Sequence, residues 1–206
     1  MKKVVCLVLV LLLTVFSGCR SGGEEVKETE SPAPESYPPM TGTHHVEIET
    51  QDYGTIFVEL DGDTAPITVG NFIGLAESGF YDGLTLHRII SGFMIQGGDP
   101  EGTGYGGSEN EIKGEFSVNK VENNISHLRG VISMARSDVS YDSASSQFFI
   151  VHQDSDFLDG AYAAFGHVTS GMDIVDRICE DTPVQDGNGT VYKADQPVIT
   201  SIKVID

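Results

Sequence analysis

The sequence predicts a mainly β domain, a closed eight-stranded antiparallel barrel capped by two α-helices. After residue 43, eight short runs contain apolar residues in alternating or continuous patterns that are typical of strands. Turn residues separate these runs, and only two stretches have the apolar spacing of a helix. A closed barrel fits this pattern, because closure removes exposed strand edges and two helices can cover the open ends.

The first two predicted strands form a hairpin around Gly54. Val46 and Ile48 alternate with polar residues before this glycine, and Ile56 and Val58 do so after it. The other six predicted strands are Leu84–Ile90, Phe93–Gln96, Val131–Ala135, Gln147–His152, Ala163–Val168 and Val198–Ile205.

The two predicted helices lie before the third strand and before the last strand. The first follows Thr64, which we expect to cap it, and has Pro66 in its first turn. Its apolar residues continue at helical spacing as far as Gly79. The second covers Met172–Glu180 and places its apolar residues on one side.

The N-terminus has the pattern of a secretory signal peptide. Two lysines precede an apolar run of 13 residues, Val4–Phe16, and Ser17-Gly18-Cys19 follows. Such a run is shorter than the roughly 20 residues that a membrane-spanning helix needs. Because the sequence before Cys19 resembles a bacterial lipobox, we expect removal of residues 1–18 and lipidation of Cys19. Plain secretion, with cleavage near Gly18, is the alternative.

Residues 19–43 are predicted to be a tether between the lipidated Cys19 and the domain. They are rich in glutamate, glycine and proline, a composition that cannot bury enough apolar surface to fold. The folded domain is therefore expected to cover residues 44–206. The chain is predicted to be an extracytoplasmic, membrane-anchored lipoprotein of a bacterium.

Composition excludes several classes of function. The 206 residues include 12 Lys and Arg against 31 Asp and Glu, a formal net charge of −19. Such an acidic surface repels nucleic acid, so we expect no nucleic-acid partner. Six scattered histidines without H-E-x-x-H or C-x-x-C spacing predict no metal, and the Gly102–Gly107 motif lacks the following helix of a dinucleotide site. We therefore expect no cofactor. Cys179 is expected to be the lone thiol of the domain, and the protein is expected to be a monomer.

The most informative stretch runs from Phe80 to Asp99 and contains Arg88 in a predicted strand. Together with four later motifs it resembles the cyclophilin family of peptidyl-prolyl cis-trans isomerases over Val46 to Asp206. The later motifs are Gly102–Gly107, Ser133–Arg136, Ser146–Ile150, and Phe157–Gly160 followed by Phe165-Gly166. The resemblance implies a cyclophilin-like barrel, a substrate groove on its outer face and proline-containing unfolded or flexible polypeptides as partners.

The resemblance also assigns roles to individual residues. Arg88 would be the catalytic arginine. The implied substrate-binding residues are Phe93, Met94, Phe149 and Leu158 around the proline, Gln96 and Gln147 beside the substrate backbone, Ala135 and Arg136 at the border of the groove, and Phe157 and Tyr162. Phe157 stands where many eukaryotic members have the tryptophan that donates a hydrogen bond to cyclosporin. Tyr162 replaces a histidine of those members, and Arg136 replaces an asparagine.

The implied reaction needs no covalent step. Rotation about an X–Pro bond loses amide resonance, and the proline nitrogen gains a lone pair as the amide twists. A guanidinium that donates to this nitrogen stabilises the twisted amide more than either planar form. A prolyl-peptide binding module or holdase chaperone with little turnover is the alternative function. A solute-binding lipoprotein is disfavoured, since such proteins usually need two lobes.

Overall fold

The computed structural model describes residues 36–206. The predicted signal peptide, Cys19 and most of the predicted tether lie outside the described residues. Within the described part of the chain, neither helix is long and apolar enough to cross a membrane.

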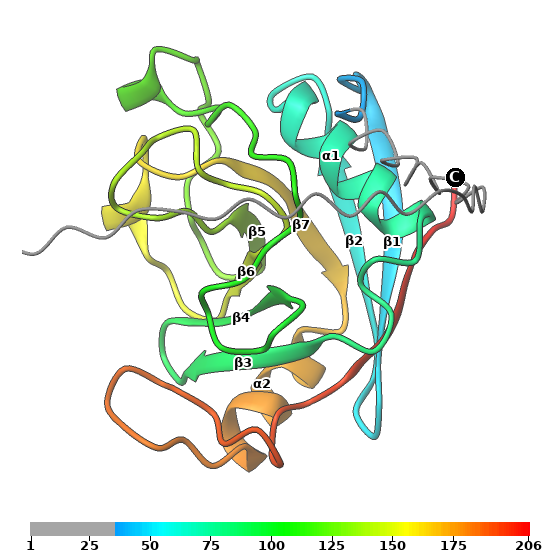
Figure 1. Cartoon of the computed structure of the whole chain (residues 1–206), viewed down its shortest axis with the longest axis vertical. Coiled ribbons are helices and arrows are strands. Elements are labelled where there is room, and N and C mark those ends of the chain that lie inside the picture. Colours follow the sequence, from blue (N-terminus) through cyan, green and yellow to red (C-terminus); the bar gives the residue numbers. More distant parts are fainter. Residues whose placement is uncertain (1–35) are drawn as a thin grey trace, which may run out of the picture. The chain divides into compact units, whose positions relative to one another are not determined.

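Eight strands form one antiparallel sheet in the described part of the chain (Figure 1). Their order across the sheet is β3-β4-β6-β5-β7-β2-β1-β8, and every paired neighbour is antiparallel. The strands are β1 (Thr43–Thr50), β2 (Gly54–Asp61), β3 (Thr85–Ile90), β4 (Met94–Asp99), β5 (Val131–Met134), β6 (Phe148–Val151), β7 (Ala164–Ser170) and β8 (Ile199–Val204). The mainly β prediction is confirmed, and each predicted strand overlaps one of these.

The prediction of a closed barrel is wrong, because the sheet is an open half-barrel with β3 and β8 at its two edges. These edges meet only near the isolated bridge between Thr85 and Val198. Farther along β3, the backbone pairs instead with a loop: Ile89 N donates to Gly189 O at 2.8 Å. The loop therefore occupies the hydrogen-bonding groups of β3 that closure would need.

The main core lies between the sheet and helix α1 (Pro66–Glu77). Phe72 is fully buried, and its ring centroid lies 5.2 Å from Tyr81, 5.4 Å from Phe148 and 5.2 Å from Phe165. Such aromatic contacts supply a large share of the buried apolar area of a small domain. The second helix, α2 (Met172–Asp181), packs against β2 and buries Ile174, Val175 and Ile178, as its apolar spacing predicts.

The first turn of α1 is capped by a side chain from a distant loop. The buried Glu115 carboxylate accepts hydrogen bonds from Ile67 N at 3.1 Å and from Thr68 N at 2.7 Å. The prediction that Thr64 caps this helix is wrong, since its hydroxyl donates to Asp61 Oδ2 at 2.7 Å. A carboxylate at this end is also favoured by the helix dipole.

The segment before β1 lies along α1, although residues up to 43 belong to the predicted tether. Met40 N donates to Pro66 O at 2.9 Å, and the Tyr37 ring occupies the space where Gly74 would otherwise carry a Cβ. Tyr37 and Met40 are partly buried against the main core. This second cover explains why α1 is buried on nearly all sides instead of being amphipathic.

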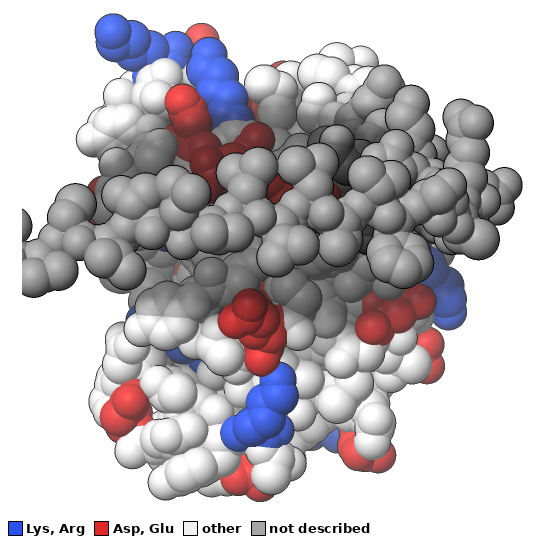
Figure 2. Space-filling model, in the orientation of Figure 1, with Lys and Arg blue, Asp and Glu red and all other residues white. Residues whose placement is uncertain are grey.

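Charged side chains do not gather at a single place on the visible face of the molecule (Figure 2). On the face drawn in Figure 2, acidic groups lie at several separate places, with basic groups between some of them.

Candidate active site

One row of paired residues crosses four strands on the outer face of the sheet. Arg88 of β3 pairs with Gln96 of β4, Gln96 pairs with Phe149 of β6, and Phe149 pairs with Ser133 of β5. Directly paired residues project to the same face of a sheet. The register therefore places the guanidinium of Arg88, a side-chain amide and an aromatic ring next to one another.

A cavity of about 590 Å³ lies over this row. It gathers all of the predicted catalytic and substrate-binding residues except Gln147: Arg88, Phe93, Met94, Gln96, Ala135, Arg136, Phe149, Phe157, Leu158 and Tyr162. The loops from 103 to 105 and from 188 to 190 also contribute to its lining. The cavity thus combines an apolar floor with two arginines, Arg88 and Arg136, in its lining.

The apolar floor belongs to a second hydrophobic cluster, separate from the main core. Met94, Phe149 and Leu158 are buried in this cluster, and Phe93 packs against it from the side. Phe157 is 70% exposed at the rim, and its ring centroid lies 5.5 Å from that of Phe93. An apolar site of this kind can take a small ring such as that of proline.

The guanidinium of Arg88 is fixed from two sides. Nε donates to the main-chain oxygen of Asn188 at 2.9 Å, and Nη2 donates to its side-chain oxygen at 3.3 Å. Nη1 donates to Gln96 Oε1 at 3.2 Å. Partial burial lowers the pKa of Arg88 from its usual value, yet an arginine keeps its charge at neutral pH. The structure therefore holds a cationic donor in one orientation at the cavity edge.

Asn188 is a site residue that the sequence analysis missed. Its loop is organised by Asp186, whose carboxylate accepts from Asn188 N at 2.9 Å and from Thr190 N at 3.2 Å. These hydrogen bonds hold the pKa of Asp186 below its usual value. The Asp-Gly-Asn-Gly sequence signals a turn, but nothing local shows that the turn lies beside Arg88.

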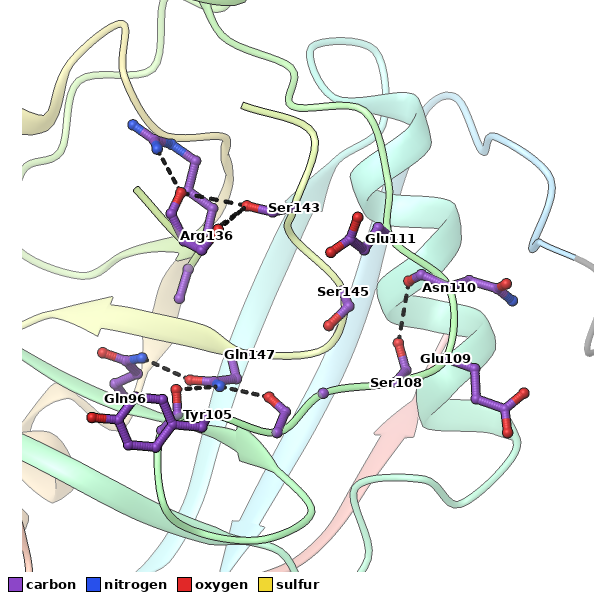
Figure 3. Close-up of a pocket in the computed structure, with 15 residues that line it drawn as sticks. Gln96, Tyr105, Ser108, Glu109, Asn110, Glu111, Arg136, Ser143, Ser145 and Gln147 are labelled. Carbon is purple, nitrogen blue, oxygen red and sulfur yellow. Dashed lines mark hydrogen bonds between the residues drawn. The ribbon is translucent and has the colours of Figure 1, made fainter. Parts of the chain in front are cut away.

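Gln147 lines an adjoining cavity of about 600 Å³ instead (Figure 3). Its Oε1 accepts from Gln96 Nε2 at 2.8 Å, and its Nε2 donates to the carbonyl oxygens of Gly104 at 3.1 Å and Gly106 at 2.7 Å. Both cavities share Gln96 and Arg136 in their lining. Gln147 is therefore part of the same site, one step away from the apolar floor.

The glycine-rich loop beside Gln147 is arranged around Asp99. Burial alone would raise the pKa of this carboxyl, but backbone N–H groups hold the pKa below its usual value. These donors include Thr103 N at 2.8 Å and Gly104 N at 2.6 Å. A carboxylate with several N–H donors is a rigid loop anchor.

Comparisons with known proteins identify the family. The family model "Cyclophilin type peptidyl-prolyl cis-trans isomerase/CLD" matches residues 45–204. The chain belongs to the cyclophilin family. As a cyclophilin-type enzyme it is a peptidyl-prolyl cis-trans isomerase.

Curated relatives of this cyclophilin include peptidyl-prolyl cis-trans isomerase B of Bacillus subtilis. That protein is 47% identical over 143 residues, which cover 69% of this chain and 90% of the relative. A peptidyl-prolyl cis-trans isomerase of Helicobacter pylori is 41% identical over 156 residues, covering 75% of this chain and 86% of the relative.

A solved structure confirms the cyclophilin fold. The crystal structure of a cyclophilin-type isomerase of Cryptosporidium parvum, determined in the presence of the dipeptide Ala-Pro, matches with a TM-score of 0.69. It is 32% identical and covers 79% of this chain and 99% of that chain.

Arg136, which replaces an asparagine of many eukaryotic cyclophilins, is surrounded by aromatic rings. Its guanidinium carbon lies 4.7 Å from the ring centroid of Tyr162, 5.2 Å from Tyr141 and 5.6 Å from Phe116. Nε also donates to Ala161 O at 3.0 Å. The guanidinium of Arg136 thus has several partners within this cyclophilin, Tyr162 among them, although Arg136 also lines both cavities.

Two buried histidines lie beneath the site. His87 is adjacent to Arg88 in the chain and lines the cavity, and burial lowers its pKa. The His127 ring stacks on Phe149 at a centroid distance of 6.0 Å, and it bonds Asp159 Oδ1 at 2.8 Å and Ser133 Oγ at 3.0 Å. Burial lowers the pKa of His127 as well. The lowered pKa values favour the neutral form of both imidazoles, and the His127 ring supports Phe149 in the cavity floor.

Proposed function

We propose that this cyclophilin assists the folding of extracytoplasmic proteins by isomerising X–Pro bonds, with Arg88 as the donor that stabilises the twisted amide. The observation that carries the proposal is the fixed guanidinium of Arg88 at the edge of an apolar cavity. The substrates proposed are proline-containing unfolded or flexible polypeptides. The Ala-Pro dipeptide present with the Cryptosporidium parvum cyclophilin supports this class of ligand.

The mechanism follows from the chemistry of the amide. The barrier of about 18–20 kcal/mol reflects the resonance lost when the C–N bond twists. The proline nitrogen becomes pyramidal in the twisted state, and its new lone pair can accept a hydrogen bond from Arg88. Because planar amides offer no such acceptor, this donor stabilises the transition state selectively. The hydrogen bonds to Asn188 and Gln96 reduce the reorganisation that this donation requires.

The remaining predicted residues would hold the substrate. Phe93, Met94, Phe149 and Leu158 offer an apolar surface for the proline ring, and excluding water there strengthens the donation from Arg88. The side-chain amides of Gln96 and Gln147 can bond the peptide backbone. We also propose that the active form is a monomer, which the elution volume in size-exclusion chromatography with light scattering tests.

The Arg88→Ala variant of the chain from residue 20 tests this mechanism. We expect its kcat/KM on a proline peptide to fall by about 10²–10³, the typical loss for one preorganised donor. Its thermal stability should stay close to that of the wild type, because Arg88 is only partly buried. Lys203→Ala, which removes an exposed cation from β8, is the matched control. A folded Arg88→Ala variant with near wild-type activity would exclude the mechanism.

A holdase with little turnover is the second candidate function. Exposed aromatic side chains at the rim favour it, since Tyr105 is 95% exposed and Phe157 is 70% exposed. Binding of an unfolded client should be measured beside isomerisation on the same protein. Client binding that survives Arg88→Ala while the isomerase activity is already negligible in the wild type would favour the holdase.

The extracytoplasmic, membrane-anchored location rests on the sequence. Lys2-Lys3, the apolar run and Ser17-Gly18-Cys19 support lipidation of Cys19 in a bacterium. Several acyl chains on one residue would bury many methylene groups, each contributing about 0.8 kcal/mol to membrane affinity. Expression with labelled fatty acid, compared with Cys19→Ser, tests this anchor. An unlabelled wild type that remains in the soluble fraction would exclude it.

A further inference from the structure

The turn between β3 and β4 carries Phe93, a wall of the proposed proline pocket that does not lie in a strand. Phe93 N donates to Ile90 O at 2.9 Å and closes the turn. Gly92 has φ +80°, in the left-handed region that favours glycine. The position of the Phe93 ring therefore depends on how firmly this turn is held from outside.

His152, directly after β6, holds this turn through two hydrogen bonds. Its main-chain N donates to Phe93 O at 2.8 Å, and its ring Nδ1 accepts from Gly92 N at 2.8 Å. The first contact is available to any residue with an N–H group. The second needs an acceptor at the Nδ1 position of the side chain.

The ring of His152 is fixed in turn by helix α2. Because Gly92 N is a donor, Nδ1 must be the unprotonated nitrogen, and the proton is on Nε2. Nε2 then donates to Asp176 Oδ1 at 3.0 Å. Arg129 Nη2 donates to Oδ1 of the same carboxylate at 2.7 Å and to its Oδ2 at 2.8 Å. Arg129 Nη1 donates to His152 O at 2.7 Å.

We infer that His152 is a positioning residue for the isomerase reaction, which links Asp176 of α2 to the Gly92–Phe93 turn and so fixes the wall of the proline pocket. His152 does not line the cavity, so it acts through the turn and not on the substrate. The inference rests on the proposed function, which gives Phe93 its role as a pocket wall.

The contact of Phe93 with a proline ring is the same in the planar and twisted amides. A loosened wall therefore weakens binding of both states equally, which raises KM and leaves kcat nearly unchanged. A general loss of folded protein would instead lower the apparent kcat without changing KM. This difference separates positioning from a purely structural role.

Two variants separate the two ring contacts of His152. In His152→Asn, the amide oxygen can accept from Gly92 N near the original Nδ1 position, whereas the contact with Asp176 is lost. In His152→Gln, the longer amide can still donate to Asp176, but its oxygen lies one bond farther along the side chain and leaves no acceptor at the Nδ1 position that bonds Gly92 N. We expect KM to rise by about three- to tenfold in His152→Gln and by about twofold or less in His152→Asn, with kcat within about twofold in both.

Amide hydrogen exchange of Gly92 gives an independent readout. It should be faster in His152→Gln than in the wild type and His152→Asn. His167→Gln, on an exposed histidine of β7, is the matched control and should leave KM and exchange unchanged. An unchanged KM in His152→Gln, or equal effects of the Asn and Gln variants, would overturn the inference.

Phe93→Ala separates this inference from the proposed function. If Phe93→Ala raises KM while His152→Gln does not, the pocket assignment stands and the role of His152 is refuted. If Phe93→Ala leaves KM unchanged, the proposed pocket itself is wrong.

Discussion

Arg88 and Gln96 face each other across β3 and β4, and the Nη1 of Arg88 donates to the Oε1 of Gln96 at 3.2 Å. Gln96 is itself held by a further hydrogen bond, in which its Nε2 donates to Gln147. Gln147 in turn donates to the carbonyl oxygens of Gly104 and Gly106. The proposed catalytic donor is therefore connected by side-chain amides to the loop that Asp99 anchors.

Gln96→Leu is expected to lower kcat/KM by about tenfold, because it removes one of the groups that orient the guanidinium. Asn188→Ala should cost less, about two- to threefold, since the main-chain oxygen that accepts from Nε remains. Both values come from a progress-curve assay on one proline peptide. A larger loss in Asn188→Ala than in Gln96→Leu would contradict this ranking.

The contact between Arg136 and Tyr162 should be measurable as a coupling energy. In a double-mutant cycle with Arg136→Ala and Tyr162→Leu, we expect about 0.5–1 kcal/mol of coupling in the free energy of unfolding. Urea denaturation of the four proteins measures it. Arg136→Ala combined with Tyr105→Ala should be additive, because Tyr105 is almost fully exposed. Additivity in the first pair would show that the ring does not stabilise the cation.

The buried histidines predict a loss of stability in mild acid. Burial lowers the pKa values of His87 and His127, so the unfolded chain binds more protons than the folded protein. The contribution of these histidines to the free energy of unfolding should therefore be at its maximum above about pH 6.5, the pKa of an unfolded histidine. It should decrease as the pH drops toward the pKa values of the folded protein, by at most about 1.4 kcal/mol per pH unit for each histidine.

Urea denaturation between about pH 8 and pH 5 measures this dependence, and His87→Gln should remove part of it. His167→Gln serves as the control, since this exposed side chain should leave the dependence unchanged. A free energy of unfolding of the wild type that does not change between about pH 8 and pH 5 would contradict this prediction.

Phe157 predicts an active isomerase that cyclosporin inhibits weakly. Its exposed ring keeps an apolar face at the rim but lacks the N–H donor of the tryptophan in strongly binding cyclophilins. Phe157→Trp should tighten inhibition by roughly tenfold or more, because a hydrogen bond and contact area are gained. Titration of both proteins with cyclosporin in the isomerase assay measures this difference in inhibition. Tight inhibition of the wild type would refute the role of Phe157.

The segment that covers α1 should contribute to stability. A chain that begins at residue 44 lacks Tyr37 and Met40, and we expect its free energy of unfolding to be about 1–3 kcal/mol lower than that of a chain beginning at residue 36. A chain beginning at residue 20 should match the one beginning at 36. Equal stability of all three would mean that this packing adds nothing.

The sequence by itself determined the elements of this cyclophilin. Eight strands and two helices follow from the apolar spacing, because that spacing reports which side of each segment is buried, and burial is a local pattern. The candidate site residues followed from the order of the motifs that resemble the family. The structure gathers them, apart from Gln147, around one cavity.

Only the tertiary structure decided which distant residues cap the helix, pair with the strand edge and support the turns. The cap of α1 is Glu115, 47 positions from Thr68, and one of the two hydrogen-bond partners of Arg88 described above is Asn188, 100 positions away. The bridge between β3 and the loop at Thr190 is likewise a contact between distant segments, and so is the hydrogen bond between Gly92 and His152. Hydrogen-bond partners of this kind depend on register and chain path, which a local pattern of apolar and polar residues does not encode.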